Sequence, residues 1–149
     1  MFTQNLEIKF KKLNENAVMP TFGTKYSAGA DLYSAEEEIT INPGETAFIG
    51  TGIAMAIPEG KVGLIYARSG LACKKGLAPA NKVGVVDSDY RGEVKVALHN
   101  HSNTQQTVLK GERVAQMVIT DYYPCTYVEC DSLDDTERGE GGFGSTGRK

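Results

Sequence analysis

Hydrophobic and polar residues alternate along several stretches of this chain, with the period of two that is typical of β-strands. In the first stretch, LEIKF (6–10), the side chains of Leu6, Ile8 and Phe10 would share one face. The same pattern, with many β-branched residues, recurs in TAFIGTGIAMAIP (46–58), KVGLIYA (61–67), EVKVALHN (93–100) and RVAQMVIT (113–120). The alternation therefore predicts a protein built mainly of strands.

Glycine and proline separate these stretches at short intervals. Turn sequences occur at NPGE (42–45), PEGK (58–61), DSDYRGE (87–93) and LKGE (109–112). Such frequent turns are typical of β-sandwiches and closed β-barrels. Only SGLACKKG (69–76) is predicted to be helical, with Ser69 as its N-cap and Gly76 as the residue that ends it. The expected fold is all-β with one short helix.

The alternation disappears near Asp131. The sequence DSLDDTERGE is acidic and nearly free of core residues, and the glycine-rich GEGGFGSTGRK (139–149) ends the chain around a single aromatic residue, Phe143. We therefore expect one β-domain over residues 1–130 and a flexible arm over residues 131–149. Fully extended, the chain from Asp131 to Phe143 spans roughly 40 Å, which is enough to cross the domain or to reach a neighbouring subunit.

The composition is that of one ordinary globular domain. Of the 149 residues, 40% are hydrophobic and 23% are charged, and the net charge is −3. Because no basic cluster is present, neither nucleic acid nor a membrane is expected as a partner. The N-terminal sequence has no long apolar run, so a cytoplasmic location is expected. Cys73, Cys125 and Cys130 form no CxxC pair, which argues against a disulfide framework or a structural zinc site.

Two sequences combine residues that suit an anionic substrate. In ARSGLA (67–72) a guanidinium, a serine hydroxyl and the free N–H groups of a helix start could hold an anion, although a helix cap beside a surface arginine would look the same. In NKVGVVDSDYRGE (81–93) several carboxylates and a tyrosine occupy a turn, which ordinary hairpin chemistry could also explain. Asp87 directly follows the apolar VGVV, so we expect it to be partly desolvated and suited to accept a proton.

Three further features are open to two interpretations. Asp31 in AGADL is either a turn aspartate or a functional carboxylate, and Gln116 lies in a mostly apolar strand, where it needs a buried partner or a ligand. His99 and His101 would point to one side of a strand, as half a metal site or as polar surface, with no third ligand evident nearby. The glycine-rich end lacks the GK[ST] triplet of a P-loop, but its N–H groups, hydroxyls and arginines suit anionic oxygens, and Phe143 suits stacking.

Taken together, AGADL, ARSGLA, NKVGVVDSDYRGE, GERVAQM and RGEGGFGSTGR resemble, in this order and spacing, the five motifs of the homotrimeric dUTP pyrophosphatases (dUTPases). The resemblance covers about residues 28 to 148. It implies a jelly-roll-type β-barrel, a homotrimer with active sites shared between subunits, and the reaction dUTP + H₂O → dUMP + pyrophosphate. It also implies Mg²⁺ bound mainly through the substrate triphosphate and water, with no direct protein ligands. This activity would limit uracil incorporation into DNA and supply dUMP for dTTP synthesis.

The resemblance assigns catalytic roles to three residues. Asp87 would be the general base that activates a water for in-line attack on the α-phosphorus. Gln116 would hold that water or the adjacent phosphate. Asp31 would act through water near the metal or near Arg68.

The resemblance also implies three sets of substrate-binding residues. The phosphates would be held by Arg68, Ser69 and Gly70. The uracil edge would be bound by Asn81 and the backbone of Val85 and Val86, the sugar face would pack against Tyr90, and Lys95 would line the same pocket. The arm would close from another subunit, with Phe143 stacked on the uracil and the distal phosphates held by Arg138, Gly144, Ser145 and Thr146.

Two alternatives share parts of this pattern. A dCTP deaminase has the same barrel and trimer, but its chemistry attacks the base and needs an acid/base group at the pyrimidine ring. A trimeric nucleotide-binding module without turnover is the second. The Asp87-centred turn and the FGSTGR end favour attack on phosphorus over both.

Overall fold

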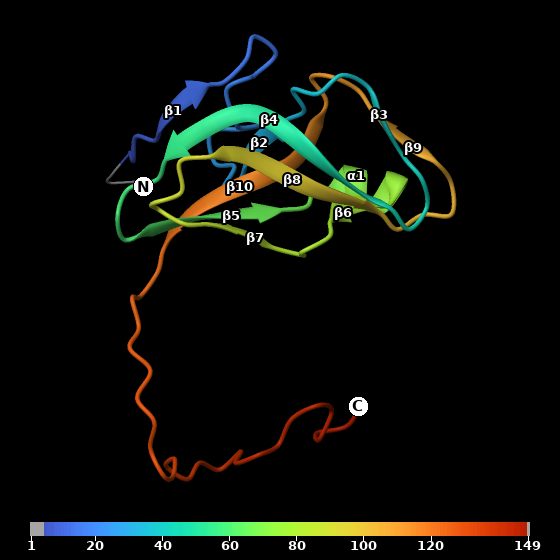
Figure 1. Ribbon diagram of the computed structural model, residues 1–149. Coiled ribbons are helices and arrows are strands. Elements are labelled where there is room, and N and C mark those ends of the chain that lie inside the picture. The colour runs from blue at the N-terminus through green and yellow to red at the C-terminus, as the bar shows by residue number, and fades with distance from the viewer. Residues whose placement is uncertain (1–4, 149) are drawn as a thin grey trace.

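Residues 5–148 are described by the structure, which is a computed structural model. It consists of strands with one short helix (Figure 1), as the alternation predicted. The elements in chain order are β1 (Lys9–Lys12), β2 (Ala30–Tyr33), β3 (Ile39–Ile41), β4 (Thr46–Ala56), β5 (Lys61–Tyr66), α1 (Ser69–Lys75), β6 (Leu77–Pro79), β7 (Gly84–Val86), β8 (Glu93–Asn100), β9 (Gln106–Val108) and β10 (Arg113–Asp121).

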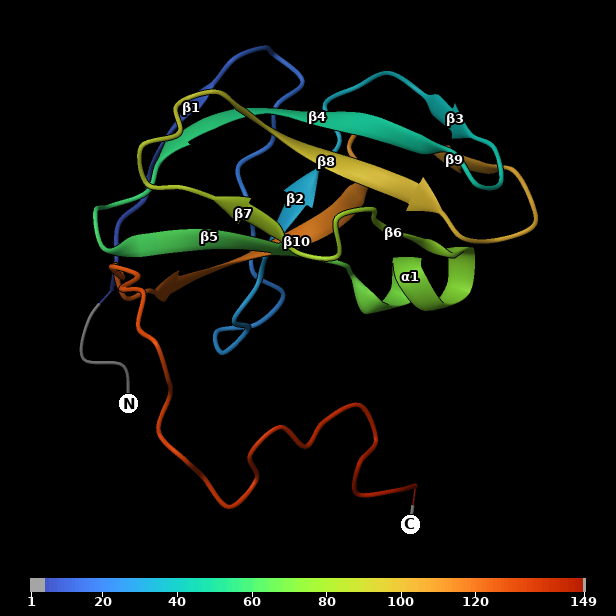
Figure 2. The ribbon, with the colours of Figure 1, turned by 60° about the horizontal axis from the view of Figure 1, so that its bottom comes forward.

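Two four-stranded sheets form the body of the protein. One has the strand order β1-β4-β8-β6 and the other β2-β10-β5-β7, while β3 and β9 pair at one end. Figure 1 shows the first sheet lying over the second, and Figure 2 shows α1 beside the end of β6. All the strand pairs are antiparallel and many join strands far apart in the sequence, such as β1 with β4 and β2 with β10.

The core lies between the two sheets and is formed by the inward half of each alternating pattern. In β8, for example, Val94, Val96 and Leu98 are buried while the residues between them are more exposed. The other large residues of this cluster are Leu32, Ile41, Ile49, Ile53, Met55, Ile57, Ile65, Leu71, Leu77, Val86, Val108, Val114 and Met117. Burial of these apolar side chains supplies the main driving force for folding.

Asn100 ends β8 inside this core. Its side chain is fully buried, and its Nδ2 donates hydrogen bonds to the carbonyls of Ile41 (2.9 Å) and Thr104 (2.8 Å). Its Oδ1 accepts from the backbone N–H and the hydroxyl of Ser102 at 2.9 and 2.7 Å. Because all four hydrogen-bonding positions of the amide are filled, Asn100 ties the end of β8 to the β3 strand and to its own loop.

The sequence placed four of the long strands within two residues of their observed ends, but it was wrong about the first. LEIKF was expected to form a strand with Leu6, Ile8 and Phe10 on one face, yet β1 begins only at Lys9, and all of its residues are exposed. It pairs only with β4, at the edge of its sheet. An edge strand with solvent on its outer side needs little apolar surface, so Leu6 and Phe10 are exposed, and of the three expected residues only Ile8 packs partly against the core.

The helix runs from Ser69 to Lys75, and the prediction that Ser69 would be its N-cap was wrong. Arg68 occupies that position in extended conformation, with φ −87° and ψ 132°, and no side-chain hydrogen bond caps the helix. The chain leaves β5 still extended through Arg68, so Ser69 is already helical. The expected end is confirmed, because Gly76 adopts a left-handed φ of 68° and its N–H bonds back to the carbonyls of Ala72 and Leu71.

The last strand ends at Asp121, and the described residues beyond it form neither strand nor helix. In both views this segment leaves the body and ends away from it (Figures 1 and 2). Its final hydrogen bond to the body runs from the Tyr122 N–H to the carbonyl of Gly60 at 3.4 Å. The division at residue 130 stays a prediction.

None of the helical structure within residues 5–148 has the length and apolarity that crossing a bilayer requires.

Candidate active site

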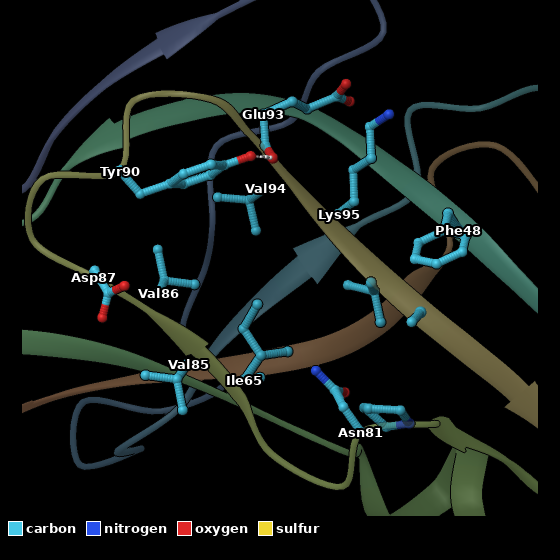
Figure 3. A pocket seen from close by; sticks show the side chains of 14 residues that line it. Phe48, Ile65, Asn81, Val85, Val86, Asp87, Tyr90, Glu93, Val94 and Lys95 are labelled. Carbon is cyan, nitrogen blue, oxygen red and sulfur yellow. Dashed lines mark hydrogen bonds between the residues drawn. The ribbon is translucent and has the colours of Figure 1, made fainter.

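A cavity of about 370 Å³ lies beside β7 and β8. Figure 3 shows it from close by, with Asn81 on one side and Tyr90 and Asp87 on the other. The residues expected around the base, the sugar and the attacking water that line it are Asn81, Val85, Val86, Asp87, Tyr90 and Lys95. They come from one continuous segment, the β7–β8 hairpin with the residues just before it. The structure thus gathers this set around one space.

Strand β7 borders the cavity as an edge strand. It pairs only with β5, so the backbone groups on its other edge have no strand partner. Gly84 and Val86 are buried and Val85 points outward. A Cβ on Gly84 would lie 3.2 Å from Ile65 Cβ and 3.5 Å from Asn81 Nδ2. The glycine therefore allows β7 to pack closely on β5 and leaves room for the Asn81 amide.

Tyr90 is held in place by the strand that follows it. Its hydroxyl donates a 2.7 Å hydrogen bond to the carbonyl of Glu93 (Figure 3), and its ring lies so close to Gly92 that a Cβ there would be 2.7 Å from Tyr90 Cζ. The Glu93 carboxylate accepts from the Gly52 N–H at 3.0 Å, which fixes the start of β8 to β4. Arg91 Nη1 donates to the Ser88 carbonyl at 2.6 Å. These bonds give the turn one defined shape.

Asp87 is exposed, so the expectation that it would be partly desolvated was wrong for this chain. The expectation treated VGVV as a uniformly buried run, but β7 alternates between buried and exposed residues, and the alternation continues to Asp87. Asp87 lines both the cavity described above and a second one of about 840 Å³ on the other side of the hairpin. Its carboxylate is therefore accessible from two sides.

A second group of polar residues lies where β2 and β10 pair. Arg68 Nε donates to Asp31 Oδ1 at 2.9 Å, and Arg113 Nη1 lies 3.6 Å from Asp31 Oδ2. The Gln116 Nε2 donates to the carbonyl of Ala67 at 2.9 Å, which supplies the partner that its place in an apolar strand required. The Asp31 side chain is only 13% exposed, because the two arginines cover it. We call Asp31, Arg68, Arg113 and Gln116 the arginine cluster.

Ser69 and Gly70 follow Arg68 and are exposed at the start of α1. Neither lines the cavity beside β7. They directly follow Arg68, which is a member of the arginine cluster, and therefore lie next to that cluster.

Within one chain the hairpin and the arginine cluster are far apart. On β5, Gln116 of β10 is opposite Tyr66, and Val86 of β7 is opposite Gly63. Relative to Gln116, Asp87 therefore lies about four residues further along the strand direction and two strands away, because β5 lies between β10 and β7. With strand geometry this places the two Cα atoms roughly 15 Å apart. Side chains of Asp and Gln cannot span that distance to hold one water molecule. The structure does not bring the two expected catalytic residues together in a single chain.

The arm residues Arg138, Phe143, Gly144, Ser145 and Thr146 form a third group, away from both others (Figure 1). Their hydrogen bonds are local, for example from Arg138 Nε to the Gly141 carbonyl at 2.7 Å and from the Ser145 N–H to the Gly142 carbonyl at 3.0 Å. Phe143 is fully exposed and has a left-handed φ of 52°.

The two histidines lie together at the end of β8. Their ring centroids are 4.6 Å apart, and His99 Nδ1 is hydrogen-bonded to Thr46 Oγ1 at 2.8 Å. Slight desolvation, then the nearby His99 and Lys82, lower the pKa of the exposed His101. Over residues 5–148, no three His, Cys, Asp or Glu side chains are grouped so as to hold a metal ion. All three cysteines are free and exposed.

Comparison with known proteins decides the family. The sequence pattern of the dUTPase family matches residues 15–147. A deoxyuridine 5'-triphosphate nucleotidohydrolase of Nautilia profundicola is 50% identical over 143 residues, covering 96% of this chain and 100% of that protein. The chain belongs to the dUTPase family.

Solved dUTPase structures share the fold. A Staphylococcus bacteriophage 80alpha dUTPase with dUPNHPP superposes with a TM-score of 0.89 at 31% identity, covering 97% of this chain and 100% of that one. A mutant dUTPase from phage phi11 of S. aureus, described with a structural Mg(II) ion, superposes with a TM-score of 0.78 at 27% identity over 86% of this chain and 99% of that one. The expected jelly-roll-type β fold of the dUTPases is thereby confirmed.

Sequence reasoning missed one charged residue in this dUTPase. Arg113 belongs to the same GERVAQM segment as Gln116, but residues three apart on a regular strand point to opposite faces. A register shift in the β10–β2 pairing between Arg113 and Ala115 inserts one extra residue. The irregularity brings Arg113 to Asp31, on the side of Gln116. The only hint in the sequence of a shared location was that Arg113 and Gln116 flank the same short apolar run, Val114 and Ala115.

Proposed function

We propose that this chain hydrolyses dUTP to dUMP and pyrophosphate. The observation that carries the proposal is the cavity beside β7 and β8, in which Asn81, Asp87 and Tyr90 meet, in a chain of the dUTPase family. Its relative of 50% identity is a deoxyuridine 5'-triphosphate nucleotidohydrolase, and the phage 80alpha dUTPase was solved with dUPNHPP. The enzyme is accordingly a dUTP diphosphatase, a hydrolase of nucleotide metabolism.

The uracil is proposed to bind between Asn81 and the open edge of β7. The Asn81 amide has no hydrogen-bond partner within residues 5–148 and points into the cavity (Figure 3). An amide and the unpaired backbone groups of an edge strand at Val85 and Val86 can match the donors and acceptors of a pyrimidine edge. A site built on such hydrogen bonds rejects a mismatched base more strongly than an apolar site does.

Tyr90 is proposed to select deoxyribose. The hydroxyl end of its ring is fixed by the hydrogen bond to the Glu93 carbonyl and by close packing on Gly92. A sugar lying on this rigid face has no room for an added 2′-hydroxyl. Lys95 borders the same cavity from β8, and its exposed ammonium, which points away from Asn81 in Figure 3, adds positive charge at the rim.

The arginine cluster is proposed to bind the phosphates. Arg68 uses Nε to bind Asp31, which leaves its two Nη groups without a partner among the described residues and orients the guanidinium. Ser69 and Gly70 add an exposed hydroxyl and a backbone without a side chain, at a place where a Cβ would meet nothing within 4 Å. Asp31 therefore acts by positioning Arg68.

Asp87 is proposed as the general base. It accepts a proton from a water as the water oxygen attacks the α-phosphorus and the bond from the α-phosphorus to the bridging oxygen of pyrophosphate breaks. Gln116 holds that water or the adjacent phosphate. Phosphoryl transfer asks the protein mainly for positioning and charge stabilisation, which suits residues without a metal cage.

Mg²⁺ fits this site as an ion carried by the substrate. The carboxylate of Asp31 is occupied by two arginines, and within residues 5–148 no three His, Cys, Asp or Glu side chains are grouped so as to hold a metal ion. Mg²⁺ prefers oxygen ligands and keeps several waters, so the triphosphate can supply its ligands, with Asp31 nearby through water. When bound, Mg²⁺ neutralises charge on the phosphate oxygens.

A homotrimer with shared active sites is proposed because one chain holds the parts of a site but does not join them. The hairpin with Asp87 and the arginine cluster with Gln116 are roughly 15 Å apart in one chain. In a ring of three copies each hairpin can face the cluster of a neighbour. The arm then closes from another subunit, with Phe143 on the uracil and Arg138, Gly144, Ser145 and Thr146 at the distal phosphates.

The competing activities are not favoured. The relatives are nucleotidohydrolases, and a dCTP deaminase would release ammonia from dCTP. A binding module without turnover would not need a base at Asp87. Incubation with dCTP and measurement of ammonia tests the first, and pyrophosphate release from dUTP tests the second.

The decisive assay is steady-state pyrophosphate release from dUTP with Mg²⁺ by the wild type and by Asp87→Asn. Loss of a general base lowers kcat by about 10²- to 10⁴-fold. Glu59→Gln is the matched control, because Glu59 is another exposed carboxylate that lines the second cavity, and it should turn over normally. Normal hydrolysis by Asp87→Asn would refute the assigned base.

A further inference from the structure

Gly29 lies directly against the side chain of Gln116. A Cβ built on Gly29 would overlap Gln116 Oε1 and would lie 3.0 Å from Cδ and 3.1 Å from Cβ of the same residue. Gly29 immediately precedes β2, which pairs with β10 so that Asp31 is opposite Gln116. The space that a side chain at position 29 would fill is thus occupied by the amide of one residue.

The backbone at position 29 does not itself require glycine. The described glycines with positive φ are Gly44, Gly52, Gly60, Gly76, Gly111, Gly139, Gly144 and Gly147, and Gly29 is not among them. An alanine could adopt the same backbone conformation without strain. What demands glycine here is the neighbouring side chain.

The amide of Gln116 is held from its two ends. Its Nε2 donates to the Ala67 carbonyl at 2.9 Å, and its Oε1 points at Gly29. Rotating the amide by half a turn brings no relief, because the NH₂ group is as large as the oxygen it replaces. An added methyl group at position 29 would therefore push the amide away from Ala67, out of its present orientation.

We infer that Gly29 is a positioning residue, which sets the orientation of the Gln116 amide for the water or phosphate that Gln116 holds. The inference rests on the role proposed for Gln116 above. Displacing the end of a flexible side chain costs little stability, whereas a misplacement of about 1 Å in an active site can lower the rate about 100-fold. The Gly29→Ala substitution should therefore separate activity from folding.

The test compares four variants by kcat and KM for dUTP and by thermal unfolding. Gly29→Ala is expected to lower kcat by about 10- to 100-fold with a smaller change in KM, while its unfolding temperature stays near that of the wild type. Gly23→Ala is the matched control, because Gly23 also lacks a positive φ and a Cβ there would meet only Ser27 Oγ, at 3.7 Å. It should retain the wild-type rate.

A double-mutant cycle with Gln116→Ala identifies the cause of any loss. Truncation of Gln116 removes the amide that the methyl group at position 29 would displace and leaves only the Cβ, 3.1 Å away, which a small shift can accommodate, so Gly29→Ala should change kcat by less than about twofold in that background. An equal loss in both backgrounds, or full activity of Gly29→Ala beside an impaired Gln116→Ala, would overturn the inference. Full activity of Gln116→Ala would instead overturn the role proposed for Gln116.

The cycle also covers a failure to fold. If Gly29→Ala is unstable because of the overlap, the double variant with Gln116→Ala should regain the stability of Gln116→Ala alone. A double variant that stays unstable would show that the backbone at position 29 is the cause, and the inference would fail.

Discussion

Two inactive variants of this enzyme should restore each other's activity when they share a trimer. Asp87→Asn removes the base on the hairpin, and Gln116→Ala removes an amide of the arginine cluster. The β10–β5–β7 register puts these residues about four positions apart along the sheet and two strands across, roughly 15 Å within one chain. In the proposed trimer, a working site therefore combines the hairpin of one subunit with the cluster of another.

The size of the recovery follows from symmetry. In a cyclic trimer that contains both variants, only one of the three hairpin–cluster pairs combines an intact Asp87 with an intact Gln116. This holds whether the trimer has two copies of one variant or of the other. Mixed trimers should thus hydrolyse dUTP at about one third of the wild-type rate. A site contained within one chain would give no recovery at all.

The assay uses two affinity tags. Each variant carries a different tag, the two are co-expressed, and trimers bearing both tags are isolated by successive purification before pyrophosphate release is measured. Sedimentation of the same sample checks the subunit number.

In a control experiment the ranking is reversed, so that sites within single chains give the higher rate and shared sites give the lower one. Wild-type subunits mixed with the double variant, Asp87→Asn with Gln116→Ala, should give about one sixth of the wild-type rate if sites are shared and about one half if each chain has its own. Background activity only, in mixed trimers of the two single variants, would refute the shared site, and a monomer in sedimentation would refute the assembly.

Three further outcomes are expected. Deleting residues 138–149 should leave thermal unfolding and subunit number unchanged, because the hydrogen bonds of its described residues stay within the arm, yet should lower kcat for dUTP sharply; loss of folding would show that the arm is structural. Asn100→Asp should lower the free energy of unfolding by about 2–5 kcal/mol, because it replaces two buried donors with acceptors facing carbonyls, and an unchanged denaturation midpoint would contradict this. The lowered pKa of His101 means that the unfolded chain takes up a proton first, so stability should fall as pH drops through about 6.5. His101→Asn should flatten that decline in thermal scans at several pH values, and an identical decline would point to another group.

Long alternating segments were predictable from the sequence, and short ones were not. The strand Glu93–Asn100 has the bounds that its alternation predicted, because four inward residues in a row leave little doubt about the period. Strands of three residues such as β3, β6 and β9 are too short to show a period, and partners distant in the sequence define them. Gly76 could be placed because its positive φ has a local cause.

The candidate site divides in the same way. Residue types and motif order were enough to name Asn81, Asp87 and Tyr90, which the fold gathers at one cavity. The exposure of Asp87 and the approach of Arg113 to Asp31 depend on strand alternation and on a register shift. The alternation was hidden because all the residues of VGVV are apolar, and the register shift belongs to the pairing of two strands, which a single sequence does not show.

The arm that leaves the barrel at Tyr122 is a tether, and this sets how strongly its tip must bind. Treated as a flexible chain, the stretch from Tyr122 to Phe143 has a root-mean-square span of about 25 Å. A group confined to a sphere of that radius has a local concentration on the order of 10 mM. An attraction that two separate molecules would barely register, with a Kd of about 10 mM, would then keep the tip docked about half of the time. Weak docking also dissociates quickly, so an arm that closes as proposed would not delay the departure of dUMP and pyrophosphate.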